Sequence, residues 1–378
     1  MAVQVQELDC LEGTLGVITL DSPGTVNSLS GDMVRDLQTA LDRWADSPHI
    51  CLVLICASGE RGFSAGSDVK ELYQALLDAP EDGHSADGIA RLLAPEYRMN
   101  YTLHGFPKPV IALAQGAVMG GGMGLLQACR YRLILPDTRL AVPEVTLGMF
   151  PDAGASWFLN RLPEGLGLFL GLTGAQLNAS DALRIGLVDL VLQPGQKDTL
   201  IDTLCQQRWS GDTAADDNRL YRLLNQQKQT RPDHLPASEL ECYEQKISRL
   251  CRDDELPVIV DRLLASREDN APWWNESISR LKTACPVSLW LVDELLRRGQ
   301  QMALKDLLRM ELVMAAECGR RPDLKEGIRA RMIDRDEQPV WSFSSVRDVP
   351  RDLVLAHFES PWSDTGHPLA TLGRPPGQ

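Results

Sequence analysis

Two glycine-rich segments place the strongest constraint on the fold of this 378-residue chain. The first is residues 63–68 (FSAGSD) and the second is residues 118–123 (VMGGGM). Each follows an apolar, strand-like run and leads into a helical pattern. Small side chains let a backbone turn sharply and bring its N–H groups close to another molecule. We therefore expect both loops to connect a strand to a helix and to present main-chain amides.

The apolar runs of the first two hundred residues predict strands, because they are short and contain β-branched residues. Helical patterns lie between several of them, and this alternation favours an α/β core. After the first loop, Asp68 is expected to cap a helix whose apolar face begins at Val69. The predicted strands are residues 15–20, 52–56, 110–113, 133–135 and 188–192.

A change in composition at residues 211–218 divides the chain into two predicted regions. Strand signals fade after it, and helical periodicity dominates, most clearly in residues 286–298. We expect a core over residues 1–210 and a mainly helical region over residues 219–378. The polar residues 79–85 are expected to form an exposed loop, and the Gly- and Pro-rich residues 373–378 a disordered tail.

Composition argues against several classes of protein. A formal net charge of −14 disfavours a nucleic-acid surface, which needs clustered Lys and Arg. The nine cysteines form neither a Cys-x-x-Cys pair nor a zinc-spaced cluster, so we expect no disulfide framework, no metal and a reducing, cytoplasmic location. No apolar run is long enough to cross a bilayer, and the first ten residues lack a basic residue, so neither membrane insertion nor secretion is expected.

Two acids downstream of the second loop are the first candidates for chemistry. Glu144 follows Pro143, and Asp152 lies between Pro151 and an Ala-Gly-Ala sequence. One interpretation is that each acid caps a helix. The other is that they form a catalytic pair, because an apolar pocket raises the pKa of a carboxylate and suits it to act as base, acid or nucleophile.

The loops themselves allow two kinds of chemistry. Two glycine-rich turns can each aim one N–H at a single developing oxyanion, which suits the carbonyl of a thioester. Residues 62–66 (GFSAG) also fit G-x-S-x-G, which leaves Ser64 as the nucleophile of a serine hydrolase. Against this alternative, the preceding strand ends too early for a nucleophile elbow, and His357 and His367 lie far down the chain.

The ordered motifs resemble the crotonase (enoyl-CoA hydratase/isomerase) superfamily. They run from Ala-Gly-Ser-Asp at residues 65–68, through the glycine triplet at 120–122 and Pro-Glu at 143–144, to Pro-Asp-Ala-Gly at 151–154. The resemblance implies a spiral of ββα units that binds acyl-CoA. It also implies that the backbone N–H groups of Ser67 and Gly121 form the oxyanion hole, with the substrate contacted by Ala65, Gly66, Asp68 and Gly120.

Within that superfamily, the chain resembles the hydrolases that act on 3-hydroxyisobutyryl-CoA. Hydratases carry a second glutamate where this chain has Gly124, whereas the hydrolase branch has acids matching Glu144 and Asp152, with Glu96 as a third, substrate-contacting acid. The C-terminal residues 325–341 resemble the ending of these hydrolases. The resemblance implies hydrolysis of a short, branched hydroxyacyl-CoA, most closely 3-hydroxyisobutyryl-CoA, in valine catabolism.

The same resemblance implies that the partner is the acyl-CoA substrate. CoA enters as part of that substrate, no separate cofactor is required, and a homo-oligomer is left open. Two other functions also stay open: an enoyl-CoA isomerase that uses Glu144 alone, and a noncatalytic acyl-CoA-binding protein. Basic residues that could meet the CoA phosphates are Arg61, Lys70, Arg320, Arg321, Lys325, Arg329 and Arg331.

Overall fold

A computed structural model describes residues 2–78, 85–228, 235–252 and 255–373. Most of the polar segment 79–85 and of the tail 373–378 therefore lies outside the described residues. The chain forms two compact units, each assembled from separate stretches of sequence. Unit 1 comprises residues 1–67, 99–140 and 177–239, and unit 2 comprises residues 68–98, 141–176 and 240–378.

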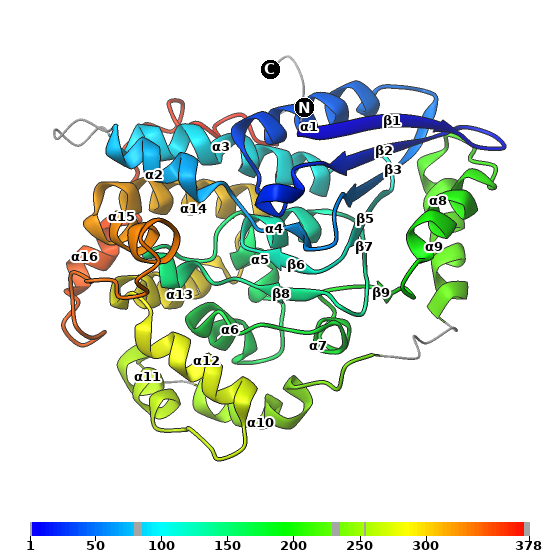
Figure 1. Ribbon diagram of the computed structural model, residues 1–378. Coiled ribbons are helices and arrows are strands. Elements are labelled where there is room, and N and C mark those ends of the chain that lie inside the picture. The colour runs from blue at the N-terminus through cyan, green and yellow to red at the C-terminus, as the bar shows by residue number, and fades with distance from the viewer. Residues whose placement is uncertain (1, 79–84, 229–234, 253–254, 374–378) are drawn as a thin grey trace. The chain divides into compact units, whose positions relative to one another are not determined.

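The centre of unit 1 is a six-stranded sheet with the strand order β1-β2-β3-β5-β7-β9 (Figure 1). Strands β2 to β9 of this sheet run parallel, and β1 pairs antiparallel with β2 at one edge. The strands are β1 (Val3–Asp9), β2 (Thr14–Leu20), β3 (Ile50–Ala57), β5 (Val110–Ala114), β7 (Tyr131–Ile134) and β9 (Leu190–Val191).

Helices cover both faces of this sheet. Every residue of β3 is buried, as expected for a parallel strand between two helical layers. On one face, Leu15 and Leu54 pack with Leu204 and Leu220, which come from α8 (Gln196–Cys205) and α9 (Thr213–Lys228). Helix α1 (Gly31–Ala45) packs on the other face, where its Trp44 ring leaves room only for the glycine at position 16 of β2.

A second sheet carries the loops of interest. It has the strand order β4-β6-β8, and each strand is only three residues long. Its strands are β4 (Gly62–Ser64), β6 (Ala117–Met119) and β8 (Arg139–Ala141), and the remaining unit 1 elements are η1 (Pro23–Thr25), α4 (Gly121–Ala128), α7 (Ala179–Arg184) and the end of α3 (Ser85–His104).

Unit 2 is built almost entirely from helices. Helices α5, α6 and α13 pack together, and α14 and α15 extend this group (Figure 1). Its elements are α2 (Val69–Leu77), most of α3, η2 (Glu144–Leu147), α5 (Ala155–Leu159), α6 (Leu166–Thr173), α10 (Leu240–Leu250), α11 (Leu256–Leu264), α12 (Pro272–Thr283), α13 (Pro286–Gly299), α14 (Leu304–Arg320), α15 (Pro322–Ile328), η3 (Arg329–Ile333) and α16 (Arg351–Ala356).

The α/β class predicted from the sequence is confirmed. All five predicted strands are present, and the helix expected after Asp68 is α2. In the described residues that follow β9, all secondary-structure elements are helices. This confirms the helical periodicity predicted for the C-terminal part of the chain. Residues 211–218 themselves lie within unit 1. All nine cysteines are free thiols, and no helix in the described ranges is both long and apolar enough to cross a membrane.

Candidate active site

The two glycine-rich loops lie against each other in unit 1. Gly66 has a φ of +97°, and a Cβ there would stand 2.8 Å from the Met119 carbonyl oxygen and 3.2 Å from the Gly121 nitrogen. Only glycine tolerates both this backbone conformation and this approach. The structure therefore brings the Gly66 and Gly121 backbones together.

Hydrogen bonds fix the first loop. The Ser64 hydroxyl donates to the Asn27 carbonyl at 2.8 Å and accepts from the Gly66 N–H at 3.1 Å. Leu29 N–H donates to the Gly66 carbonyl at 2.8 Å, and this bond does not use the Ser67 N–H. The loop is thus held by its neighbours through bonds that do not use the Ser67 N–H.

These contacts argue against a serine nucleophile. The Ser64 side chain is completely buried, and its hydroxyl is occupied in holding the loop. His357 and His367 are also buried, and main-chain atoms meet Nδ1 of His357 and both ring nitrogens of His367. Ser64 is a structural residue of the loop, so the serine-hydrolase interpretation is wrong.

The second loop ends at the start of a helix. Gly121 is the first residue of α4, so its N–H has no acceptor within the helix. The aligned peptide dipoles of α4 give this end a partial positive charge. An oxyanion placed here would be stabilised by both effects, although the Ser67 and Gly121 roles stay predictions.

The other predicted residues of the first loop have different surroundings. Ala65 is exposed and Gly66 is buried. Asp68 caps α2, because its side chain accepts hydrogen bonds from Lys70 N–H at 3.0 Å and Glu71 N–H at 3.3 Å. The capping part of the Asp68 prediction is confirmed, whereas substrate contact by Asp68 and by Gly120 remains a prediction.

Glu144 opens the short 3-10 helix η2 in unit 2. Its side chain is buried, and Oε2 has no hydrogen-bond partner among the described residues. Burial raises the pKa of Glu144 well above its ordinary value, and the charge of Asp152 raises it further. An unpartnered buried carboxylate oxygen is costly for a structural residue, but it is suited to attack a carbonyl or accept a proton.

The turn that carries Glu144 is pressed against α15. A Cβ at Gly148 would overlap the Asp323 carbonyl, and a Cβ at Gly327 would overlap the backbone of Leu147. The Val145 carbonyl also accepts from the Cys285 N–H at 2.9 Å. Backbone meets backbone at both glycines, so α15 fixes the position of the Glu144 turn.

Asp152 lies in the loop between η2 and α5. Its Oδ2 accepts a hydrogen bond from the Tyr97 hydroxyl at 2.5 Å, and both side chains are buried. Burial raises the pKa of Asp152 to about 6, although the bond from Tyr97 acts in the opposite direction. A group with this pKa changes its charge close to neutral pH.

The helix-cap interpretation of the two acids is wrong. Neither η2 nor α5 has a side-chain capping bond from its own N-cap residue, which is Pro143 in one case and Gly154 in the other. The carboxylate of Glu311, on α14, accepts from the Gly154 N–H at 2.8 Å and the Ser156 N–H at 3.2 Å instead. Glu144 and Asp152 are therefore free of this structural task.

Four buried carboxyl groups of unit 2 influence one another. Glu96 is 2 % exposed, so it is a core residue of α3 rather than a solvated one. The charges of Asp152, Glu96 and Glu311 all raise the pKa of Glu144. Perturbed acids gathered in this way are typical of catalytic sites. Across the described ranges, no three His, Cys, Asp or Glu side chains form a group that could hold a metal ion.

Sequence reasoning missed Tyr97 and Glu311. Tyr97 directly follows Glu96, which the sequence identified as a candidate. A helical pattern does not show which of these two neighbouring side chains contacts Asp152. A usable signal existed for Glu311, because it interrupts the apolar stripe formed by Leu308, Leu312 and Ala315. An acid at a core position of a helix is rarely buried without a specific partner.

Most of the C-terminal basic residues are engaged in ion pairs. Arg320 and Arg321 pair with Glu317, and Arg329 pairs with Glu326 and two aspartates. Arg331 pairs with Glu337. Among the described residues, Arg61, Lys70 and Lys325 are exposed and have no ion pair, which leaves these three as the better candidates for meeting phosphate.

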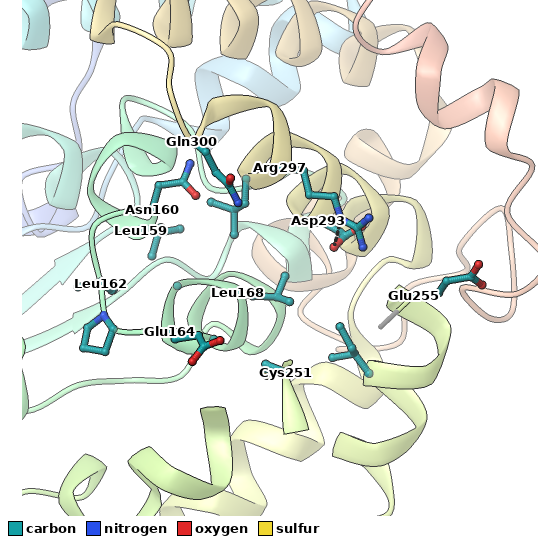
Figure 2. A pocket seen from close by; sticks show the side chains of 15 residues that line it. Leu159, Asn160, Leu162, Glu164, Leu168, Cys251, Glu255, Asp293, Arg297 and Gln300 are labelled. Carbon is teal, nitrogen blue, oxygen red and sulfur yellow. Dashed lines mark hydrogen bonds and ion pairs between the residues drawn. The ribbon is translucent and has the colours of Figure 1, made fainter. Parts of the chain in front are cut away.

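Unit 2 also contains a pocket of about 700 Å³ that is separate from these acids (Figure 2). Leucine side chains such as Leu168 line it together with Glu164, Asp293 and Arg297. Asp293 and Arg297 form an ion pair within it at 3.1 Å. None of the predicted catalytic or substrate-binding residues lines this pocket.

Comparison with known proteins identifies the family. The sequence profile described as Enoyl-CoA hydratase/isomerase matches residues 15–358. The chain belongs to this family. It is 31% identical over 345 residues to "3-hydroxyisobutyryl-CoA hydrolase, mitochondrial" of Gallus gallus, which covers 91% of this chain and 86% of the relative. The protein of the same name from Homo sapiens is 28% identical over 354 residues, covering 92% and 87%.

Two solved structures share the fold. An enoyl-CoA hydratase from Rhodobacter sphaeroides 2.4.1 has a TM-score of 0.79 and 30% identity, covering 94% of this chain and 97% of its own. A carnitinyl-CoA dehydratase from Mycobacterium thermoresistibile also has a TM-score of 0.79 and 30% identity, covering 95% and 96%. The crotonase resemblance found in the sequence is thereby confirmed.

The hydrogen bond from Tyr97 gives a first testable prediction. Tyr97→Phe should raise the pKa of Asp152 above about 6, because it removes a donor that stabilises the carboxylate and leaves the effect of burial unopposed. An NMR titration of the carboxyl carbons would measure the shift. Tyr73→Phe, on α2, is the control, since the tyrosine hydroxyl that donates to Asp152 is that of Tyr97. An unchanged or lowered pKa in Tyr97→Phe would contradict the assignment.

Proposed function

We propose that this chain hydrolyses the thioester of a short, branched hydroxyacyl-CoA, with 3-hydroxyisobutyryl-CoA as the preferred substrate. The observation that carries the proposal is the buried pair Glu144 and Asp152, in a chain that aligns over most of its length with relatives named for this hydrolysis. Gly124, at the position of the second hydratase glutamate, also favours hydrolysis over hydration. On this substrate the enzyme would act in valine catabolism.

The proposed reaction begins at the thioester carbonyl. Its oxygen accepts hydrogen bonds from the Ser67 and Gly121 amides, which stabilise the negative charge that develops as the carbonyl carbon is attacked. Such donors are effective because they are already oriented before the reaction starts. The contacts that hold Ser64 and Gly66 provide this orientation for the first loop.

Glu144 supplies the attacking group in one of two ways. It attacks the carbonyl carbon itself, which forms a mixed anhydride that water then hydrolyses, or it removes a proton from an attacking water. In both routes the carbon–sulfur bond breaks, the CoA thiolate leaves with the electron pair, and water supplies the oxygen of the acid product. Asp152 orients the substrate hydroxyl or the water, and Glu96 contacts the polar end of the acyl group. The reaction requires no additional cofactor.

A direct assay tests the function. The purified chain is incubated with 3-hydroxyisobutyryl-CoA and a thiol reagent that reports free CoA. We expect continuous release of CoA, and lower kcat/KM for unbranched acyl-CoA thioesters without the hydroxyl group. Conversion of a 3-enoyl-CoA without release of CoA would establish an isomerase instead. Tight binding without either reaction would establish a noncatalytic acyl-CoA-binding protein.

Lys70 and Lys325 are proposed to meet the CoA phosphates. They lie on α2 and α15, which pack together in unit 2, and both are exposed. Replacing both by alanine should raise KM by about tenfold or more, since a charge-assisted hydrogen bond contributes about 1.5–3 kcal/mol. The effect should diminish at high salt, which screens exposed charges.

A double variant of Lys282 and Lys305 is the matched control for this experiment. It removes the same charge from α12 and α14 of the same unit. Steady-state kinetics at low and high salt would compare the two variants. Equal KM values for them would show that net charge, rather than contact with phosphate, determines the effect.

A further inference from the structure

Glu311 is a fully buried acid to which the proposed reaction gives no task. It lies in the middle of α14 and has 0 % exposure. Its Oε2 accepts from the Gly154 N–H at 2.8 Å, and its Oε1 accepts from the Ser156 N–H at 3.2 Å and the Ser156 hydroxyl at 2.5 Å. No ion pair to Glu311 exists among the described residues. A carboxyl group buried without a cation is expensive, so its retention needs a reason.

The segment that Glu311 contacts begins immediately after Asp152. Ala153 has a φ of +55°, a left-handed conformation that is strained for a residue with a Cβ. Helix α5 follows, but it has only five residues and no capping side chain of its own. The Ala155 N–H donates to the Asp152 carbonyl at 2.9 Å, but no side chain of the segment itself caps the start of α5. The three hydrogen bonds to Glu311 supply what the turn lacks.

We propose that Glu311 is a positioning residue for Asp152, because it holds the strained turn at Ala153 and Gly154 from the side of α14. The Asp152 carboxylate is then fixed from two directions. Tyr97 donates to its side chain, and Glu311 anchors the main chain that follows it. This inference rests on the proposed role of Asp152 in thioester hydrolysis and adds a residue from the C-terminal helices to that site.

The protonation of Glu311 is compatible with this task. Burial raises the pKa of Glu311 to about 8, although the bonds from Ser156 and Gly154 lower it. A neutral carboxyl group still offers acceptor oxygens to two main-chain N–H groups. A glutamine at this position keeps one acceptor oxygen, whereas a leucine of similar size keeps none. The two substitutions therefore separate the hydrogen bonds from the volume of the side chain.

The test is a double-mutant cycle on CoA release. Glu311→Leu should lower kcat by about 10²-fold, the size of effect that a small misplacement of a catalytic group produces, with little change in KM. Glu311→Gln should recover a large part of this loss. In an Asp152→Asn background, Glu311→Leu should have little additional effect on kcat, because the residue it positions is already disabled.

A purely structural Glu311 would behave differently. In that case Glu311→Leu would lower the thermal stability and leave kcat per folded molecule unchanged. Alternatively, the loss of kcat in Glu311→Leu would multiply with the loss in Asp152→Asn. Either result overturns the proposal. If Glu311→Leu does not fold, Ser156→Ala, which removes the hydroxyl donor at 2.5 Å, takes its place in the cycle.

Two controls keep this inference separate from the proposed function. Glu317→Gln, on the same helix, loses ion pairs with Arg320 and Arg321 and should leave kcat unchanged. A loss of kcat in Glu317→Gln equal to that in Glu311→Gln would overturn the inference. If Asp152→Asn retains full CoA release, the role of Asp152 fails, whatever Glu311 does. If Asp152→Asn lowers CoA release and the effect of Glu311→Leu on kcat is the same with or without Asp152→Asn, only the positioning role of Glu311 fails.

Discussion

Replacing Glu144 by glutamine is expected to lower kcat for CoA release by about 10²- to 10⁴-fold, with KM nearly unchanged. The amide occupies almost the same volume, so the buried position at the start of η2 can be kept. It is, however, a poor nucleophile and a poor base. The unpartnered Oε2 of Glu144 is the atom whose chemistry is removed. Steady-state kinetics, together with a binding measurement using an acyl-CoA, would separate turnover from affinity.

The matched control for this variant is Glu326→Gln. Glu326 lies on α15, where it pairs with Arg329 at 2.8 Å, and it has no role in the proposed chemistry. It should retain the parental kcat. If Glu144→Gln keeps the parental kcat as well, Glu144 is neither nucleophile nor base, and another group must start the reaction.

The second large effect is expected at the oxyanion hole. Gly121→Pro removes one N–H at the first position of α4, where an N–H has no intrahelical acceptor. Losing one oxyanion donor typically lowers kcat by about 10²- to 10³-fold. Because the charge on the oxygen develops mainly in the transition state, KM should change much less. Kinetics and the melting temperature would be measured on the same preparation.

Gly121→Ala isolates the role of the amide. Alanine adds a methyl group but keeps the N–H, so it should retain far more activity than proline at the same position. Similar losses in the two variants would show that side-chain volume near Gly66, rather than the missing donor, lowers the rate. That result would remove Gly121 from the proposed oxyanion hole.

The sequence predicted the elements that have a strong periodic signal. Buried strands such as β3 consist of apolar, β-branched runs, and α2 begins at a capping Asp68, so both were recognised. Strands β4, β6 and β8 were missed because three residues are too few to establish a period. The edge strand β1 alternates apolar and polar residues from Val3, and this available signal was overlooked.

At the candidate site, the sequence could not predict contacts between residues that are far apart in the chain. The glycine loops and the acids Glu144 and Asp152 stand in recognisable motifs, so their sequence positions could be named in advance. Tyr97, which donates to Asp152, comes from α3, and Glu311, which holds the turn after Asp152, comes from α14, far away in the chain. The two units also alternate along the chain, which a change in composition cannot reveal. Periodicity records which residues are buried, but it does not record which buried polar groups meet.

The bare contact between the Glu144 turn and α15 has a consequence for how genetic variation should be interpreted. At Gly148 and Gly327 no side chain separates the two backbones. A larger residue at either position therefore cannot be accommodated by shortening a neighbouring side chain. A missense change at Gly327 would displace the Glu144 turn, because the added Cβ would overlap the backbone of Leu147. A side-chain substitution elsewhere could not relieve either overlap, because the atoms that would be overlapped belong to the opposite backbone.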